Sequence, residues 1–325
     1  MGQKIMTGNL PRSVDDLRRE GVLDLAGGQL TTIPESLGHM ALLEELDLDR
    51  NQLVSLPASI GQMANLKSLS LYNNRLASLP DSVWRLTDLQ ILNLAENRFS
   101  FLPEGIGNLT ELRMLDLGHN ELAFLPEAIG NLQNLSFLYA SNNRLTSLPG
   151  SLWDLDGLLY LNITDNQLSS LPDAVGNLAR LIELRLYNNQ LSSLPDSLGR
   201  LSKLRELHLM DNKLMSLPEA LGGLKNLRKL ILQGNQLTSL PESLGELANL
   251  TDLDLRNNSL EALPDSLGKL AHLRHLDLRA NKLVNLPCGL GELTNLEKLD
   301  LRWNKRLILP DWVRLLEERG CTVFV

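Results

Sequence analysis

Residues 112–134 read LRMLDLGHNELAFLPEAIGNLQN, and the same 23-residue pattern recurs along most of the chain. Thirteen of the fourteen prolines fall on a grid with this period, from Pro34 to Pro310. Twelve asparagines form a second grid, each six residues before a proline, and Gly28 takes the asparagine position of the first repeat. A fixed period of this length predicts a solenoid, in which each repeat packs mainly on its two neighbours.

Each repeat contains a short segment with strand periodicity. In Leu115-Asp116-Leu117 the alternation turns both leucines inward and the aspartate outward. One strand per repeat then stacks in parallel on the next. The column asparagine at the strand's end carries both donors and an acceptor, so we expect it to be buried and to bond the backbone of the turn. Replacement of a central one is expected to cost about 1–3 kcal/mol.

The Leu-Pro pair after each asparagine predicts an extended bend, because proline fixes its own φ and keeps the preceding residue out of the helical region. The Ile/Leu-Gly-x-Leu segment that follows is too short for a long helix and has glycine in ten repeats. We therefore expect a thin convex side built from irregular or 3-10 segments.

The unit L-x-x-L-x-L-x-x-N-x-L-x-x-L-P-x-x-I-G-x-L-x-x resembles the leucine-rich-repeat family in its 23-residue intracellular form. The resemblance covers residues from about 20 to 319 and is closest in kind to Ras-associated leucine-rich-repeat scaffolds, Scribble and Erbin, plant intracellular Ras-group-related proteins and bacterial proteins made of the repeat alone. It implies an α/β solenoid: an arc with a parallel concave sheet of about 13 strands and short convex segments, capped at both ends.

Both ends of the chain depart from the repeat, as capping requires. We expect an N-terminal cap over residues 1–19, including a short helix from Ser13. Thirteen repeats follow over 20–310, and a capping helix and strand over 311–325. On this interpretation the chain is a complete solenoid rather than a piece of a larger enzyme.

Charge and composition restrict the partners. The net charge of −8 and pI near 5.3 argue against nucleic acid and anionic membrane, which require concentrated positive charge. Only Cys288 and Cys321 are present, so no disulfide framework is expected, and a reducing compartment fits. The first residues lack the apolar stretch of a signal peptide. These features predict a cytoplasmic monomer without a metal or cofactor.

Outward strand positions do not pack the core, so they are the expected site of partner specificity. All four tyrosines fall on these positions, and tyrosine and methionine supply large amphipathic contact area. The alternative is that aromatic residues merely suit a strand surface. The predicted partner-binding residues are Tyr72, Met114, Phe137, Tyr139, Tyr160, Arg185, Tyr187, His208, Arg256, Arg279 and Arg302.

The last three of these come from a triplicated Leu-Asp-Leu-Arg, which places an aspartate column beside an arginine column. Such columns could orient a charged partner, or they could neutralise each other as a solvated ladder of little energetic value. Trp84 and Trp153 replace the convex glycine. They could mark a second site, but the more common role of such a tryptophan is to cover neighbouring leucines.

Catalytic constellations are weak. His272 and His275 are expected on different faces of their repeat, Cys288 lacks a nearby fixed histidine, and the Gly-x-Gly pairs lack phosphate-loop spacing. The sequence therefore predicts a protein-recognition scaffold that binds a partner protein on its concave face and does not catalyse a reaction. Two alternatives stay open: a bacterial effector or host-interaction protein, and a non-catalytic subunit of a ubiquitin-ligase or GTPase signalling complex.

Overall fold

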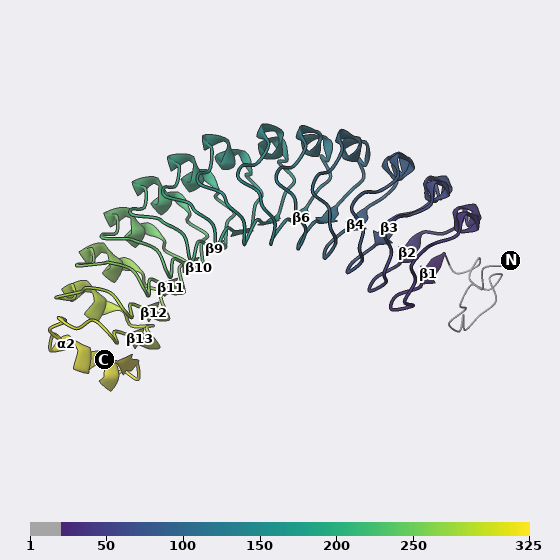
Figure 1. Ribbon diagram of the computed structural model, residues 1–325. Helices are drawn as coiled ribbons and strands as arrows, with labels where there is room; N and C mark the ends of the chain where they lie inside the picture. Colours follow the sequence, from purple (N-terminus) through teal and green to yellow (C-terminus); the bar gives the residue numbers. More distant parts are fainter. Residues whose placement is uncertain (1–20) are drawn as a thin grey trace. The chain divides into compact units, whose positions relative to one another are not determined.

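The computed structural model describes residues 21–325, so the predicted N-terminal cap lies outside the described residues. The chain forms two compact units, Met1–Asn143 and Arg144–Val325. Figure 1 shows that within each unit the strands lie along the inner side and short helical turns lie along the outer side. The predicted repeat therefore alternates between these two sides once every 23 residues.

Every described repeat contributes one three-residue strand, and neighbouring strands within a unit pair in parallel. The register repeats the sequence period, so that Leu46 lies opposite Leu69. The described part of unit 1 contains β1 (Val22–Asp24), β2 (Glu45–Asp47), β3 (Ser68–Ser70), β4 (Ile91–Asn93), β5 (Met114–Asp116) and β6 (Phe137–Tyr139). Unit 2 contains β7 (Tyr160–Asn162), β8 (Glu183–Arg185), β9 (Glu206–His208), β10 (Lys229–Ile231), β11 (Asp252–Asp254), β12 (His275–Asp277), β13 (Lys298–Asp300) and β14 (Thr322–Phe324).

The outer side consists of five-residue 3-10 helices. Each begins directly after a Leu-Pro proline in extended conformation, such as Pro57 with φ −69° and ψ 149°. They are η1 (Glu35–His39), η2 (Ala58–Gln62), η3 (Asp81–Arg85), η4 (Glu104–Asn108), η5 (Glu127–Asn131), η6 (Gly150–Asp154), η7 (Asp173–Asn177), η8 (Asp196–Arg200), η9 (Glu219–Gly223), η10 (Glu242–Glu246), η11 (Asp265–Lys269) and η12 (Cys288–Glu292). The predicted parallel-stranded solenoid with short 3-10 segments is thus confirmed.

The core is a stack of leucines in equivalent positions. Leu115 and Leu117, which flank the outward Asp116, are both fully buried. The same alternation recurs in the other strands, with the central residue buried in β1 to β13. Because each buried leucine contacts equivalents one repeat away, removal of one weakens its own repeat and both neighbours.

The asparagine column is buried at the end of the strands, as predicted. In β8's repeat, the Nδ2 of Asn189 donates to the carbonyl oxygens of Leu186 (3.1 Å) and, one repeat earlier, Ile163 (2.9 Å). Its Oδ1 accepts the backbone N–H of Leu168 at 2.9 Å. One side chain therefore joins two successive repeats through both of its polar atoms, and the pattern recurs along each unit.

The outer glycine column exists because successive 3-10 helices approach closely. A Cβ added at Gly245 would lie 2.2 Å from the carbonyl oxygen of Ser266. Trp84 occupies the same column, and it is accommodated because Gly105 lies against its ring where most other repeats carry serine or alanine. Trp84 and Trp153 are only 4% and 2% exposed, so they cover the leucine core and do not form a second surface site.

After the last repeat, α2 (Trp312–Glu318) packs on η12, and β14 pairs with β13. The ring of Trp312 lies against Gly291 on the outer side. Residues 21–325 therefore contain fourteen strands: one from each of the thirteen repeats, and β14 from the segment that follows them. Within the same residues, no helix has the length and apolar character that crossing a membrane demands.

Candidate partner-binding face

The side chains on outward strand positions, and on the position two residues after each strand, form the strand face of each unit. Three outward side chains per repeat lie beside their equivalents in the next strand, because the strands pair residue for residue. The predicted site residues all belong to this face. Phe137 is 40% exposed, and the other ten are half-buried.

In unit 1, Tyr72 lies among charged residues. Its hydroxyl donates to Oε1 of Glu96 at 3.0 Å, and the guanidinium of Arg50 lies 6.0 Å from its ring centroid. The hydrogen bond to Glu96 is the main cause that raises the pKa of Tyr72 above its usual value. Asp49 accepts the backbone N–H of Tyr72 and the hydroxyl of Ser70. Tyr72 is therefore held in place by its own repeat and both neighbours.

Met114, Phe137 and Tyr139 form the apolar part of the same face in unit 1. Met114 on β5 lies opposite Phe137 on β6, and Tyr139 lies opposite Asp116. Burial raises the pKa of Asp116, whose carboxylate accepts the backbone N–H of Gly118. The structure brings these three predicted residues together, but Tyr72 lies two strands away from β5 and belongs to a separate cluster.

In unit 2, Tyr160, Arg185, His208 and Tyr187 form a cluster of aromatic and charged side chains on the strand face. The guanidinium of Arg185 lies 5.7 Å from the ring centroid of Tyr160, and its Nε donates to the carboxylate of Glu183. Arg185 lies opposite His208 on β9, and Tyr187 follows on the same face. This tyrosine-arginine cluster combines a cation–π contact with a paired charge, so its surface is pre-organised.

Glu183, Glu206 and His208 could in principle hold a metal ion, since each offers one ligand atom and these atoms lie within 4.8 Å of one another. The carboxylates, however, already have cationic partners. Arg185 pairs with Glu183, and Lys229 Nζ lies 3.0 Å from Glu206 Oε1. Burial alone would raise the pKa of Glu206, but hydrogen bonds from His208 and Lys229 outweigh it and lower that pKa. A metal would have to displace both cations, so we assign none.

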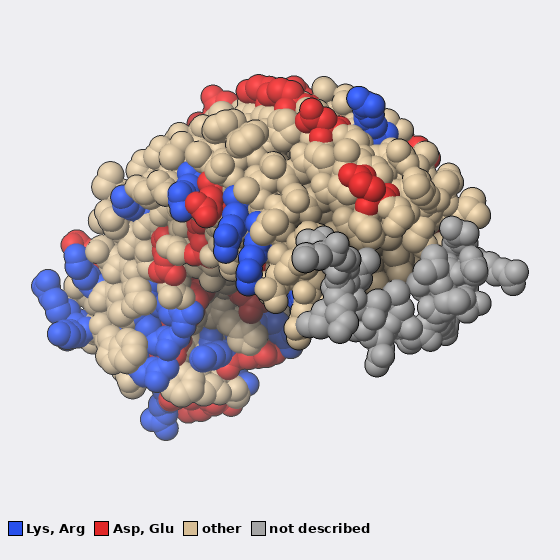
Figure 2. Space-filling model, turned by 45° about the vertical axis from the view of Figure 1, so that its right-hand side comes forward, with Lys and Arg blue, Asp and Glu red and all other residues tan. Residues whose placement is uncertain are grey.

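The arginine column on β11 to β13 is tied to the aspartate column. Nη2 of Arg302 lies 2.7 Å from Oδ2 of Asp300, which is fully buried, and Nε of Arg279 lies 3.4 Å from the same oxygen. Nε of Arg256 lies 3.2 Å from Asp254. Figure 2 shows this interleaving of positive and negative side chains over the C-terminal part of unit 2. The contacts favour the self-neutralising ladder over a free basic surface.

Beside this ladder the strand face contains a hollow of about 350 Å³, which the sequence did not reveal. Ile231 and the carboxylates of Asp252, Asp254 and Asp277 line it, together with His275, whose Nδ1 lies 2.6 Å from Asp252. Burial raises the pKa of Asp254. The hollow emerges only when four strands are placed side by side, so no single repeat contains a signal for it.

The side chains considered for catalysis are separated. His272 bonds the carbonyl of Ala248, whereas His275 lies on the strand face. Cys288 is exposed at the start of η12, and Cys321 is buried just before β14, where burial raises its thiol pKa.

A further feature of the face escaped the sequence analysis. The residue before each column asparagine has a left-handed backbone, with φ between 52° and 67° at the eleven non-glycine positions and 69° at Gly234. In the first repeat, Gly27 and Gln29 on either side of Gly28 are also left-handed, with φ 67° and 55°. Side chains usually avoid this conformation, which costs about 1–2 kcal/mol per residue. These left-handed residues, which include Glu96 and Trp303, form a further row of side chains that lies next to the asparagine column.

Comparison with known proteins agrees with this geometry. The family profile described as "Leucine-rich repeat region" matches residues 100–218 and 212–318, and two shorter repeat profiles match residues 64–122 and 42–63. The chain belongs to the leucine-rich-repeat family. No curated protein matches it significantly.

Among solved structures, a leucine-rich-repeat protein of Leptospira interrogans is 36% identical, with a TM-score of 0.86 over 91% of this chain and 76% of that protein. The ectodomain of the receptor kinase GASSHO1/SCHENGEN3 from Arabidopsis thaliana, solved with CASPARIAN STRIP INTEGRITY FACTOR 2, is also 36% identical. Its TM-score is 0.70, over 87% of this chain but only 38% of the ectodomain. An internalin from Listeria monocytogenes is 23% identical with a TM-score of 0.83, over 95% of this chain and 88% of that one, and shows a shared fold alone.

Proposed function

We propose that this leucine-rich-repeat chain is a protein-recognition scaffold that binds a partner protein on its concave strand face and has no catalytic activity of its own. The tyrosine-arginine cluster of unit 2 carries the proposal. Tyrosine and arginine are enriched among the residues that dominate interface energies, and this pair is already fixed in one arrangement by Glu183. A surface ordered before binding loses less conformational entropy when a partner docks.

The cluster's residues have distinct proposed roles. Tyr160 and Tyr187 supply apolar contact area with polar tips, and Arg185 and His208 supply donors between them. In unit 1, Met114, Phe137 and Tyr139 form a second contact area, and Tyr72 fixes a polar contact near Glu96. Because their charges are paired with aspartates, Arg256, Arg279 and Arg302 are proposed to contact the partner at the margin of the face and to contribute little to affinity.

Two related structures support a recognition role by analogy. The plant receptor structures similar to this chain were solved with the peptide hormone RGF2 and with CASPARIAN STRIP INTEGRITY FACTOR 2. This chain spans about half or less of those receptors' length, so their ligands are not carried over. The proposal includes a cytoplasmic location, because the sequence has only two cysteines and its first residues lack the apolar stretch of a signal peptide. It also includes a monomeric state. Cell fractionation tests the location, and light scattering tests the oligomeric state.

Affinity capture from source-cell lysate tests the function. Wild type is compared with Tyr160→Ala/Tyr187→Ala, and the matched control is Met215→Ala, which removes an exposed side chain of the same unit outside the strand face. Circular dichroism first establishes that all three proteins are folded. The proposal expects a protein that wild type and the control retain and the double variant loses. Partners bound equally by all three would place the contact surface elsewhere, and turnover of nucleotide or ubiquitin conjugates by the pure chain would contradict the absence of catalysis.

A further inference from the structure

Trp303 departs from the pattern of the tryptophans in this protein. It is 66% exposed, whereas Trp84 and Trp153 are buried and Trp312 is half-buried. Its backbone is also left-handed, with φ 67°, a conformation that is a genuine outlier for a bulky residue. A large apolar side chain that is both exposed and held on a strained backbone gains nothing for the core. Because the turn of every repeat imposes this conformation on the same column, what distinguishes Trp303 is its large exposed apolar side chain, which points to an interaction surface.

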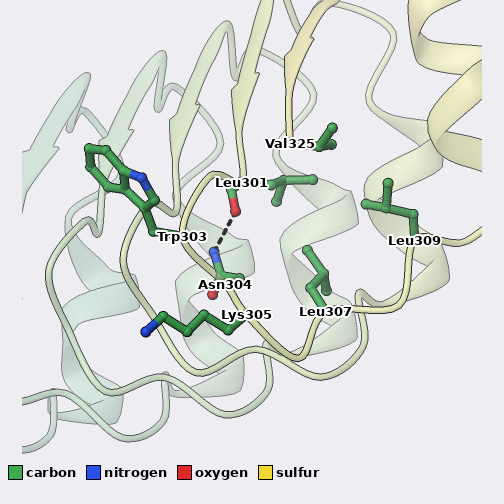
Figure 3. Close-up of a pocket in the computed structure, with 7 residues that line it drawn as sticks. All are labelled: Leu301, Trp303, Asn304, Lys305, Leu307, Leu309 and Val325. Atoms are coloured by element: carbon green, nitrogen blue, oxygen red, sulfur yellow. Dashed lines mark hydrogen bonds between the residues drawn. The ribbon is translucent and has the colours of Figure 1, made fainter.

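Trp303 lines a hollow at the C-terminal end of unit 2, where repeat stacking stops (Figure 3). The cavity measures about 330 Å³, and its apolar lining consists of Trp303, Leu301, Leu307, Leu309 and Val325. In the view of Figure 3, Leu307, Leu309 and Val325 lie on one side of the bond from Asn304 Nδ2 to the carbonyl of Leu301, and Trp303 and Lys305 lie on the other. That bond, at 2.8 Å, fixes the turn that presents Trp303.

Stacking explains why the hollow is open here. Leu309 occupies the leucine position of the Leu-Pro pair, and its equivalents Leu263 and Leu286 are 9% and 7% exposed. Leu309 is 45% exposed, because among residues 21–325 no repeat follows that would cover it. The size lies at the lower end of ligand pockets, which suits one or two side chains of a protein partner better than a large cofactor.

The charges around the hollow select the partner's chemistry. Lys305 is the one charged residue in the lining, and Arg306 follows it, also exposed. Neither forms an ion pair with any residue between 21 and 325. The guanidinium of Arg302 lies 5.8 Å from the Trp303 ring and adds positive charge beside it, although Asp300 pairs with it. An apolar hollow that has the unpaired Lys305 in its lining, with the exposed Arg306 next in the chain, is complementary to an acidic segment that carries an apolar side chain.

We infer that this hollow docks an extended acidic segment of a partner protein, which inserts one large apolar side chain against Trp303 and places carboxylates near Lys305 and Arg306. A nucleic acid fits less well, because the chain carries a net charge of −8 and the hollow has a single aromatic ring instead of a stacking series. A symmetric dimer through this surface would bring Lys305 and Arg306 of two copies together, and like charges oppose that contact.

Selection from a displayed library of random dodecapeptides tests the inference. The library is selected on wild type and, in parallel, on Trp303→Gly, a substitution that the left-handed backbone favours and that should leave the fold intact. Met215→Ala is the matched control, since Met215 is an exposed residue of the same unit at 59%. We expect wild type and the control to enrich peptides with a large apolar residue beside Asp or Glu, and Trp303→Gly to lose them.

Binding of the most enriched peptide, made synthetically, then gives the magnitude. Loss of one well-packed aromatic contact predicts affinity about tenfold weaker for Trp303→Gly and for Lys305→Glu/Arg306→Glu. Tyr160→Ala/Tyr187→Ala should bind it like wild type, which separates this surface from the tyrosine-arginine cluster. Enrichment that is independent of Trp303, enrichment of basic or neutral peptides, tighter binding of oligo(dT), or a wild-type dimer that Trp303→Gly abolishes would each overturn the inference.

Discussion

Replacement of Asn212 by alanine is the most informative test of what holds the repeats together. Asn212 is 7% exposed and makes four hydrogen bonds. Its Oδ1 accepts the N–H of Leu191 at 3.0 Å, and its Nδ2 donates to the carbonyls of Leu186 (3.0 Å), Leu209 (3.1 Å) and Met210 (3.2 Å). The substitution removes all four bonds without touching the leucine core.

The expected cost follows from which groups lose every partner. The carbonyl of Leu186 keeps a bond from Asn189, and that of Leu209 keeps one from Asn235. The buried N–H of Leu191 keeps none among residues 21–325. The buried N–H of Leu191, left without an acceptor, costs about 1–3 kcal/mol. Each of the three bonds to a carbonyl that keeps another donor costs less, about 0.5 kcal/mol. We therefore expect Asn212→Ala to lower the free energy of unfolding by about 3 kcal/mol.

Urea unfolding followed by circular dichroism measures this quantity, with Lys213→Ala as control because Lys213 is exposed in the same repeat. The control should change stability by less than about 0.5 kcal/mol. A loss below about 1 kcal/mol for Asn212→Ala, with an unchanged slope, would refute the view that the asparagine ladder joins successive repeats. A broadened transition would instead show that the repeats unfold separately, as a linear array permits.

Four further substitutions follow from the structure. Asp300→Asn should destabilise the protein by about 2 kcal/mol at pH 7, because the hydrogen bonds from Arg302 stabilise the ionised carboxylate. These bonds lower the pKa of Asp300 despite its burial, so the stabilisation that they provide is lost as the pH falls below the usual pKa of 3.8. Asp254→Asn should instead stabilise the protein at pH 7, because burial raises the pKa of Asp254, and it should have no effect on stability well below pH 3.8. Urea unfolding of both variants as a function of pH makes the comparison. Gly245→Ala should cost about 3 kcal/mol in the same assay, since its Cβ would lie 2.2 Å from a backbone oxygen. A loss under about 1 kcal/mol would disprove that close approach. Ala280→Gly should stabilise the protein by about 0.5 kcal/mol and so raise its melting temperature slightly. Ala280 has φ 53°, and the strain that glycine relieves there exceeds the extra conformational entropy that glycine gives the unfolded chain. A lower melting temperature would contradict this.

The repeat could be predicted from sequence because each column has its own physical requirement. Leucine alternation, the buried amide of Asn189 and the Leu-Pro bend act within one or two repeats, so their spacing alone predicts strand, ladder and 3-10 turn. How Trp84 is accommodated could not be predicted from its own repeat. Its burial depends on Gly105, one repeat away, and a tryptophan in a glycine column gives no sign of that compensation.

The candidate site was harder to predict, because it depends on relations between strands. The sequence places Arg279 and Arg302 outward, but their pairing with a fully buried Asp300 follows only from the register of β12 and β13. The left-handed backbone at Trp303, by contrast, had a signal in the sequence, since seven of the twelve residues that precede the column asparagines are Asn, Asp or Gly, the types that adopt this conformation most readily. Backbone conformation there is set by the turn around the next asparagine, and the side chain merely tolerates it.

Photo-crosslinking is the most direct test of the central claim that the strand face of unit 2 contacts a partner protein. A benzophenone amino acid replaces Tyr187 in one variant and Met215, an exposed residue of the same unit outside the cluster, in another. Both variants are expressed in source cells, irradiated and analysed by mass spectrometry. The account predicts one partner protein crosslinked through position 187 and not through position 215. Equal crosslinking at both positions, or crosslinking at position 215 alone, would contradict it.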